Sequence, residues 1–136
     1  MRVKLDDGAI LPTRAHEYDA GLDIYTRERI VLRPKDSAFV DSGVHVEIPY
    51  GYVGLLRSKS GLMCNQDITT DGTIDAGYSG SIGVKMFNHG DKLKIFNLGD
   101  KITQLVVVPC RLDPVEIVDQ IASGERGENG FGSTGR

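Results

Sequence analysis

The chain has 136 residues and a mass of 14.8 kDa, which is the size of one domain. Nineteen acidic side chains outnumber sixteen basic ones, and the net charge of −3 argues against direct binding of nucleic acid but allows a small anion in a local basic pocket. The longest apolar run, at residues 105–109, is too short to cross a bilayer and no signal peptide is recognisable, so a cytoplasmic protein without membrane contact is expected.

Short strand-like runs follow one another along most of the chain. They alternate apolar and polar residues or are rich in β-branched residues, and Gly, Pro and Asp separate them. We expect strands near residues 3–5, 29–32, 37–40, 44–48, 52–56, 81–87, 92–96, 102–108 and 114–118. Many short strands with frequent turn signals predict an all-β domain, a jelly-roll-like sandwich or barrel.

Local signals refine this picture. SGLMCN predicts one short helix, with Ser60 as the N-cap whose hydroxyl binds the first free N–H groups. NHGD, at residues 88–91, predicts a tight hairpin between the strands on either side of it, because Asn and Gly tolerate a positive φ. Cys64 and Cys110 match no metal or redox spacing and are expected to be reduced thiols in the core.

Two segments in the first half of the chain carry charged residues in unusual settings. AGLDIYT holds Asp23 between apolar neighbours, either as an ordinary turn acid or as the partner of a cation. RSKSGL gathers Arg57, Lys59 and Ser60 at the predicted helix start, a setting that suits an anion.

Three later segments are equally specific. GTIDAGYSG places Asp75 and Tyr78 in a glycine-rich turn between strands, where the simplest roles are capping and packing. GDKITQL puts Gln104 on a strand directly after a turn. RGENGFGSTGR ends the chain with four glycines, which suits either a mobile tail or an arm that orders over a ligand. We expect residues 1–123 to form the domain and residues 124–136 to form a flexible C-terminal arm.

In order and spacing, these five segments resemble the five motifs of the trimeric dUTPases, the deoxyuridine 5′-triphosphate nucleotidohydrolases. The resemblance runs from Ala20 to the end, and GTIDAGYSG and GFGSTG are its most specific parts. The family usually has Arg-Ser-Gly in the second motif, whereas Lys59 stands in the place of that arginine here. Lysine keeps the charge but loses the bidentate fork, so either Arg57 or Lys59 would contact phosphate. Asn129 also stands where glycine is common.

The resemblance implies a homotrimer with shared active sites that hydrolyses dUTP to dUMP and pyrophosphate, keeping uracil out of DNA and supplying dUMP for thymidylate synthesis. Asp75 would be the base that activates water for attack on the α-phosphorus. Mg²⁺ would be held mainly by the triphosphate and water, with Asp23 in its outer shell. The implied substrate-binding residues are Arg57, Lys59, Ser60, Gly61, Gly72, Ile74, Tyr78 and Gln104, together with Arg126, Phe131, Gly132, Ser133 and Thr134 of the arm.

Three other functions remain open at this point. A dCTP deaminase shares this fold, but it would need a general acid/base near C4 of the pyrimidine, usually a glutamate, which the Asp75 turn lacks. A non-catalytic regulator could use the same pocket to bind dUTP and signal to a protein partner. A structural jelly roll without a ligand would leave the glycine-rich arm without a purpose.

Overall fold

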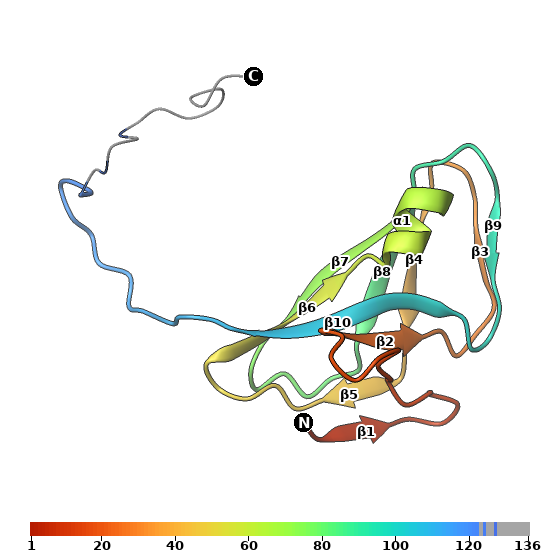
Figure 1. Ribbon diagram of the computed structural model, residues 1–136, viewed down its shortest axis with the longest axis horizontal. Helices are drawn as coiled ribbons and strands as arrows, with labels where there is room; N and C mark the ends of the chain where they lie inside the picture. Colours follow the sequence, from red (N-terminus) through yellow and green to blue (C-terminus); the bar gives the residue numbers. More distant parts are fainter. Residues whose placement is uncertain (123, 125–126, 128–136) are drawn as a thin grey trace.

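Strand β10 (Lys101–Pro109) lies second from one edge of the six-stranded main sheet, between the edge strand β2 (Gly21–Tyr25) and β6 (Tyr52–Arg57) (Figure 1). The computed structural model describes residues 1–122, 124 and 127. Beyond β6 the sheet continues through β7 (Ile68–Ile74), β8 (Gly83–Asn88) and β4 (Ser37–Asp41), and every neighbouring pair is antiparallel.

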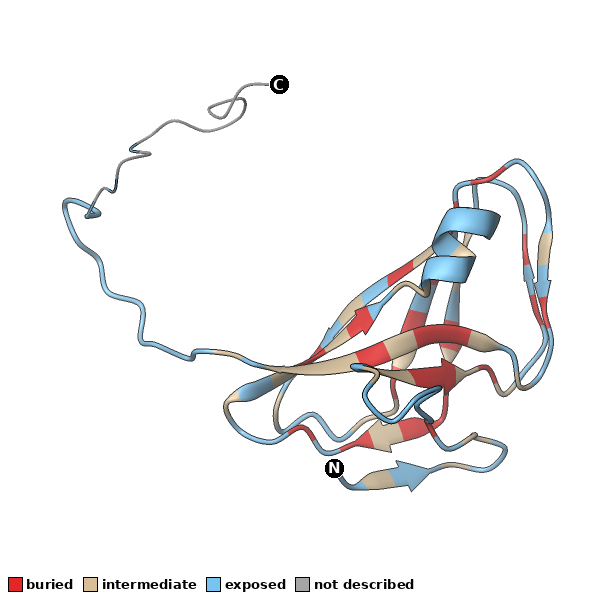
Figure 2. Cartoon of the chain, viewed as in Figure 1, coloured by how far each residue is buried: buried red, intermediate tan, exposed pale blue. Residues whose placement is uncertain are grey.

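Two small sheets and one helix complete the described part. β1 (Val3–Leu5) pairs with β5 (Val44–Val46), and β3 (Ile30–Leu32) pairs with β9 (Lys94–Phe96). Helix α1 (Ser60–Gln66) lies between β6 and β7 in sequence and buries none of its residues, as its pale colour in Figure 2 shows. No described helix is long and apolar enough to span a membrane.

The core is made of aliphatic side chains that the strands direct inward. On β8, for example, Val84 and Met86 are fully buried while Lys85 between them is exposed, so the period of two sets the inner face. Side chains from all three sheets join this core, among them Ile24, Leu32, Val40, Val44, Leu56, Ile68, Ile82, Phe96, Ile102 and Leu105. The curled, mostly β fold with one short helix confirms the predicted class.

The predicted hairpin at residues 88–91 is wrong. β8 and β9 do not pair, because β9 crosses to β3 while β8 lies between β7 and β4. Asn88 explains the departure: its buried side-chain amide donates to the backbone carbonyls of Leu32, Arg33 and Lys92 at 2.9–3.2 Å, and its Oδ1 accepts from the N–H of Gly90. Asn88 therefore links β3 to the end of β8, and the segment does not form a hairpin.

Other local predictions also fail. No strand forms at residues 114–118, where Val115 and Ile117 are 98% and 97% exposed. Lys59, not Ser60, occupies the N-cap of α1, and no side chain caps the helix. Neither cysteine is in the core: both are free thiols, Cys64 exposed and Cys110 half-buried, because the first lies on the exposed helix and the second follows the end of β10.

Candidate functional site

The turn between β7 and β8 presents Asp75 and Tyr78 to solvent. β7 ends at the buried Ile74 and Asp75 follows it, exposed, with its carbonyl accepting from the N–H of Tyr78 at 3.1 Å. Gly77, with a φ of +87°, lets the chain reverse. The Tyr78 ring folds back over Gly80, where a Cβ would lie 2.3 Å from the phenol oxygen, so a larger residue there would displace the ring.

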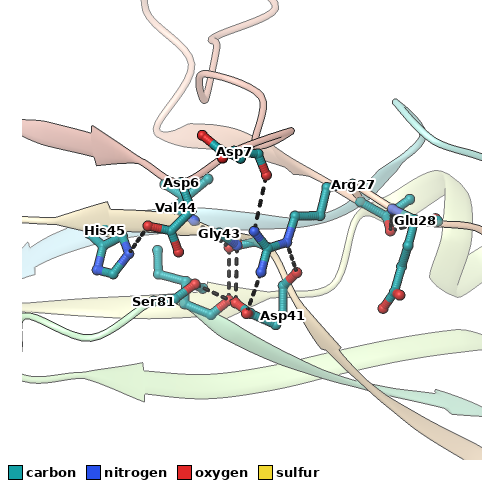
Figure 3. A network of polar contacts seen from close by, with 12 residues as sticks. Asp6, Asp7, Arg27, Glu28, Asp41, Gly43, Val44, His45 and Ser81 are labelled. Atoms are coloured by element: carbon teal, nitrogen blue, oxygen red, sulfur yellow. Dashed lines mark hydrogen bonds and ion pairs between the residues drawn. The ribbon is translucent and has the colours of Figure 1, made fainter.

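A polar network holds the returning side of this turn (Figure 3). The hydroxyl of Ser81 donates to Asp41 Oδ1, and the N–H of Gly43 donates to the same atom at 3.0 Å. These two bonds, with the nearby Arg27, hold the pKa of Asp41 below its ordinary value. Arg27 donates to Asp41 Oδ2 at 2.6 Å and to the Asp41 carbonyl at 3.2 Å, which fixes β4 to the segment after β2. Tyr78 adds a bond from its hydroxyl to the Ser81 carbonyl at 3.1 Å.

Asp23 is a buried carboxylate between two lysines. It lies on β2 and is 4% exposed, with Lys59 bonded to Oδ1 and the Lys101 ammonium 2.7 Å from Oδ2. Burial opposes ionisation, but the bonds from Lys101 and Lys59 outweigh it and hold the pKa of Asp23 below its ordinary value. Of the two roles left open for Asp23, the partner of a cation is confirmed. The cluster carries one net positive charge, which suits an anionic ligand.

Gln104 lines a cavity of about 340 Å³ together with Asp23 and Lys59 of this cluster. On β10 it stands opposite Asp23 of β2 on one side and Arg57 of β6 on the other. Its amide donates to the Ser58 carbonyl at 3.2 Å. The cavity is lined by two cations, two carboxylates and one amide: Arg57, Lys59, Asp19, Asp23 and Gln104.

The base candidate lies apart from this cavity. Arg57 pairs with Asp71 in the β6–β7 register, and Asp75 comes four residues later, roughly 13 Å along the strand. Asp75 and Tyr78 do not line the cavity of Gln104. Gly72 lies within β7 opposite Leu56, and Ser60 and Gly61 open α1. Within one chain the predicted residues therefore form two groups.

The predicted arm residues, Arg126, Phe131, Gly132, Ser133 and Thr134, lie outside the described residues. Sequence reasoning missed Lys101 and gave His45 no role. Lys101 stands in GDKITQL at the start of β10, and the signal was available: a buried acid on one strand needs cations on its neighbours. For His45 no sequence signal existed, since its partners come from distant segments.

A bound cation has few protein ligands to draw on here. Across residues 1–122, no group of three or more His, Cys, Asp or Glu side chains is placed to hold a metal ion. Both oxygens of Asp23 already face lysine ammonium groups. Asp23 therefore suits contact with a hydrated ion better than direct ligation, and a triphosphate would have to supply the inner ligands.

The sequence and the fold both match known dUTPases. The dUTPase family model matches residues 7–135. The deoxyuridine 5′-triphosphate nucleotidohydrolase of Picosynechococcus sp. is 39% identical, covering 98% of this chain and 96% of its own, and that of Clostridium acetobutylicum is 41% identical, covering 97% and 93%.

Solved structures of phage enzymes give the same picture. A variant dUTPase of Staphylococcus bacteriophage 80alpha, solved with dUpNHpp, superposes with a TM-score of 0.93 at 34% identity, over 99% of this chain and 98% of its own. A variant dUTPase from phage phi11 of S. aureus, described with a structural Mg(II) ion, gives a TM-score of 0.83 at 33% identity, over 90% and 98% of the two chains.

Proposed function

Because the chain belongs to the dUTPase family, we propose that its two groups of site residues meet between subunits of a homotrimer to hydrolyse dUTP to dUMP and pyrophosphate. The activity is that of a dUTP diphosphatase, a hydrolase that depends on Mg²⁺. It removes dUTP from the nucleotide pool of the cytoplasm, which keeps uracil out of DNA and supplies dUMP for thymidylate synthesis. The observation that carries the proposal is the cavity lined by Gln104, Arg57 and Lys59, together with the exposed Asp75 that lies apart from it on a separate turn.

Asp75 acts as the general base. Its carboxylate stands exposed on the β7–β8 turn, where a water molecule can reach it. Water attacks the α-phosphorus, its proton passes to Asp75, and the bond from the α-phosphorus to the bridging oxygen breaks. Pyrophosphate leaves with the electron pair of that bond, and the α-phosphoryl group stays on dUMP.

The cavity of Gln104 receives the triphosphate. Gln104 donates from its amide to the α-phosphate, while Lys59 and Arg57, which line the same cavity, contact the phosphates beyond it. Ser60 and Gly61, at the start of α1 directly after Lys59, add further contacts to these phosphates. Lys59 is held in place by Asp23, whereas Arg57 makes a solvent-exposed pair with Asp71 at 3.5 Å and is free to reorient. Mg²⁺, bound by phosphate oxygens and water, neutralises part of the negative charge of the triphosphate.

The end of β7 and the turn that follows it select the nucleoside. Backbone groups of Gly72 to Ile74 can pair with the O2, N3 and O4 atoms of uracil, and a close backbone leaves no room for the methyl group of thymine. Tyr78 lies under the deoxyribose, where its ring excludes a 2′-hydroxyl. The close packing of that ring on Gly80 supports this assignment.

A homotrimer explains why the two groups lie apart within one chain. The turn of one subunit can approach the cavity of another, which removes the separation of roughly 13 Å. The segment after β10 also exposes a set of large apolar side chains that suits burial against a second copy. Those side chains are Leu112, Val115, Ile117, Val118 and Ile121.

The C-terminal arm closes over the bound nucleotide. In this proposal Phe131 covers the uracil, Arg126 meets the γ-phosphate, and Gly132, Ser133 and Thr134 supply backbone and hydroxyl donors. These residues lie outside the described part, and their roles rest on the motif RGENGFGSTGR.

The proposal is tested by following two products from two substrates. Purified protein with MgCl₂ should release pyrophosphate from dUTP, and excess EDTA should abolish the release. Ammonia release from dCTP would instead identify a deaminase. Tight binding of dUTP without turnover would identify a non-catalytic regulator, and neither binding nor turnover would leave a structural domain.

A further inference from the structure

His45 joins three segments that are far apart in the sequence. It lies on β5, and its Nδ1 is 2.8 Å from the carbonyl oxygen of Ser79, in the turn that follows Tyr78. Its Nε2 is 3.1 Å from Oδ1 of Asp6, just after β1 (Figure 3). The imidazole is only 17% exposed, so water does not easily replace either contact.

Both partners of this histidine accept hydrogen bonds and cannot donate. A carbonyl oxygen has no proton, and Asp6 is held ionised, since the contact with His45 outweighs its burial and lowers the pKa of its carboxyl group. A neutral imidazole has one N–H and can satisfy one of the two, whereas the imidazolium satisfies both. The same two bonds raise the pKa of His45 above its ordinary value of 6.5, with the Ser79 carbonyl as the larger cause.

The two contacts differ in the charge of the acceptor, and this difference decides which ring nitrogen keeps its proton when His45 is neutral. The Ser79 contact is the shorter, at 2.8 Å against 3.1 Å, but only Asp6 carries a full negative charge. A bare ring nitrogen beside that carboxylate costs more than one beside a neutral carbonyl, so the remaining proton stays on Nε2. Nδ1 then turns a lone pair toward the lone pairs of the Ser79 carbonyl. Deprotonation of His45 thus converts an attraction to the turn into a repulsion.

We propose that His45 is a positioning residue that holds the Ser79 side of the β7–β8 turn, and through it Tyr78, in place for the nucleotide only while both of its ring nitrogens carry protons. This inference rests on the proposed function, because it assigns Tyr78 to the nucleoside. The link to Tyr78 is short: Ser79 lies between Tyr78 and Gly80, on which the tyrosine ring rests. Tyr78 and His45 also line one cavity of about 500 Å³.

The surroundings contain few other charges that could control the turn. From β1, Lys4 lies 3.6 Å from the same oxygen of Asp6 and opposes protonation of His45, while Arg27 acts on Asp6 from the other side. Arg2 and Glu47, which also line the cavity, pair with each other. Gly77, Tyr78 and Ser79 of the turn line this cavity, and the phenol of Tyr78 is the titratable group among them.

The test measures KM and kcat for dUTP from about pH 6 to about pH 9, where a histidine changes its charge. For the wild-type protein, KM should rise roughly three- to tenfold across this range as the contact to Ser79 is lost, with a smaller change in kcat. His45→Asn places an amide donor near the Nδ1 position and should keep KM low throughout. His45→Gln places its donor near Nε2 instead and should show a high KM at every pH.

Asp6→Asn provides the decisive control. An asparagine can donate to Nε2, so a neutral His45 can keep its proton on Nδ1 and its bond to Ser79. The pH-dependent rise in KM should disappear in this variant while kcat stays near the wild-type value. Ionisation of the phosphates of dUTP affects all variants alike. A KM profile in Asp6→Asn that still follows the wild-type profile overturns the inference.

NMR separates this inference from the proposed function. In ¹⁵N-labelled protein, the amide of Gly80, which shares a peptide group with the Ser79 carbonyl, should shift with the same midpoint as the ring of His45, and the neutral ring should be the Nε2–H tautomer. An Nδ1–H tautomer, or a Gly80 amide that does not follow the ring, refutes the role of His45. Absence of dUTP turnover at every pH would refute the proposed function instead.

Discussion

Gln104 on β10 packs so closely on Gly21 of β2 that a Cβ atom at residue 21 would lie 2.1 Å from Oε1 of the glutamine. The obstructing atoms are the end of a flexible side chain, so Gly21→Ala should displace Gln104 without unfolding the domain. We expect kcat/KM for dUTP to fall about tenfold, the scale of one lost hydrogen bond, while the melting temperature stays almost constant.

A double-mutant comparison isolates this effect. If Gly21→Ala acts by moving Gln104, it should add little to the loss already caused by Gln104→Ala. Independent, additive losses would show that the alanine disturbs something other than the glutamine.

Asp75→Asn should preserve the shape of the turn and most of the affinity for dUTP but remove the base. We expect kcat to fall at least ~100-fold, the usual contribution of general-base catalysis. Rapid-quench or pyrophosphate-release kinetics would measure the loss, and isothermal titration with a non-hydrolysable dUTP analogue would check binding. Turnover near the wild-type rate would remove Asp75 from the mechanism.

Asp23→Asn should destabilise the fold, because it leaves Lys59 and Lys101 beside a buried neutral group. The loss should be about 1–3 kcal/mol, below the value for fully buried pairs because both lysines are partly exposed. The pKa of Asp23 is lowered by folding, so its stabilisation is present above the ordinary pKa of an aspartate and is lost as the pH falls through the folded-state pKa.

Urea denaturation at several pH values checks this prediction. The difference between Asp23→Asn and the wild type should be full at neutral pH and should shrink in acid. Asp71→Asn is the matched control: its carboxylate pairs with Arg57 at 3.5 Å with 80% of its side chain exposed, and its removal should change stability little. Equal effects of the two variants would contradict the special role of Asp23.

The trimer prediction concerns the apolar segment after β10. Replacing both Val115 and Ile117 by glutamate should weaken assembly and reduce turnover, because charged groups would enter the proposed contact between subunits. Glu116→Gln, in the same exposed segment, should not. Light scattering should give three times 14.8 kDa for the wild type, and a monomer at that mass would refute the trimer.

The arm should matter for catalysis but not for folding. Ending the chain after residue 123 should leave the melting temperature nearly unchanged, since the buried core ends at Leu105. Phe131→Ala should lower kcat/KM roughly tenfold or more, because one stacked ring contributes about 1–3 kcal/mol. Arg126→Ala should do at least as much by removing a charged contact to phosphate. Unimpaired dUTP hydrolysis by the truncated protein would show that the arm is a passive tail.

Periodicity predicted most strands because each exposes one face and buries the other, as β8 shows. Periodicity could not reveal which strands pair with one another. NHGD at residues 88–91 carries the local signal of a hairpin, yet the amide of Asn88 binds the carbonyls of Leu32 and Arg33, at the end of β3, and of Lys92, before β9. The apolar residues at 114–118 alternate like a strand but find no partner strand within the described part of the chain.

The candidate site was also predictable only in part from the sequence. Motif spacing pointed to Asp23, Gln104 and Asp75, because their segments are recognisable as short strings. It did not find His45 or Lys101, whose significance depends on residues brought to them by folding. Nor could it show that Asp75 and Gln104 lie apart within one chain, because that follows from the register of β6 with its neighbours.

The position of β10 between β2 and β6 has a consequence for synthesis of the protein. It is the last strand in the described chain, yet it separates β2 from β6, and β2 has no other partner strand in the part of the sheet that is described. While the ribosome is still making the earlier strands, β2 and β6 both present unpaired edges. Completion of the sheet must therefore wait until residue 109 has emerged, and until then the nascent chain is exposed to edge-to-edge association with its neighbours.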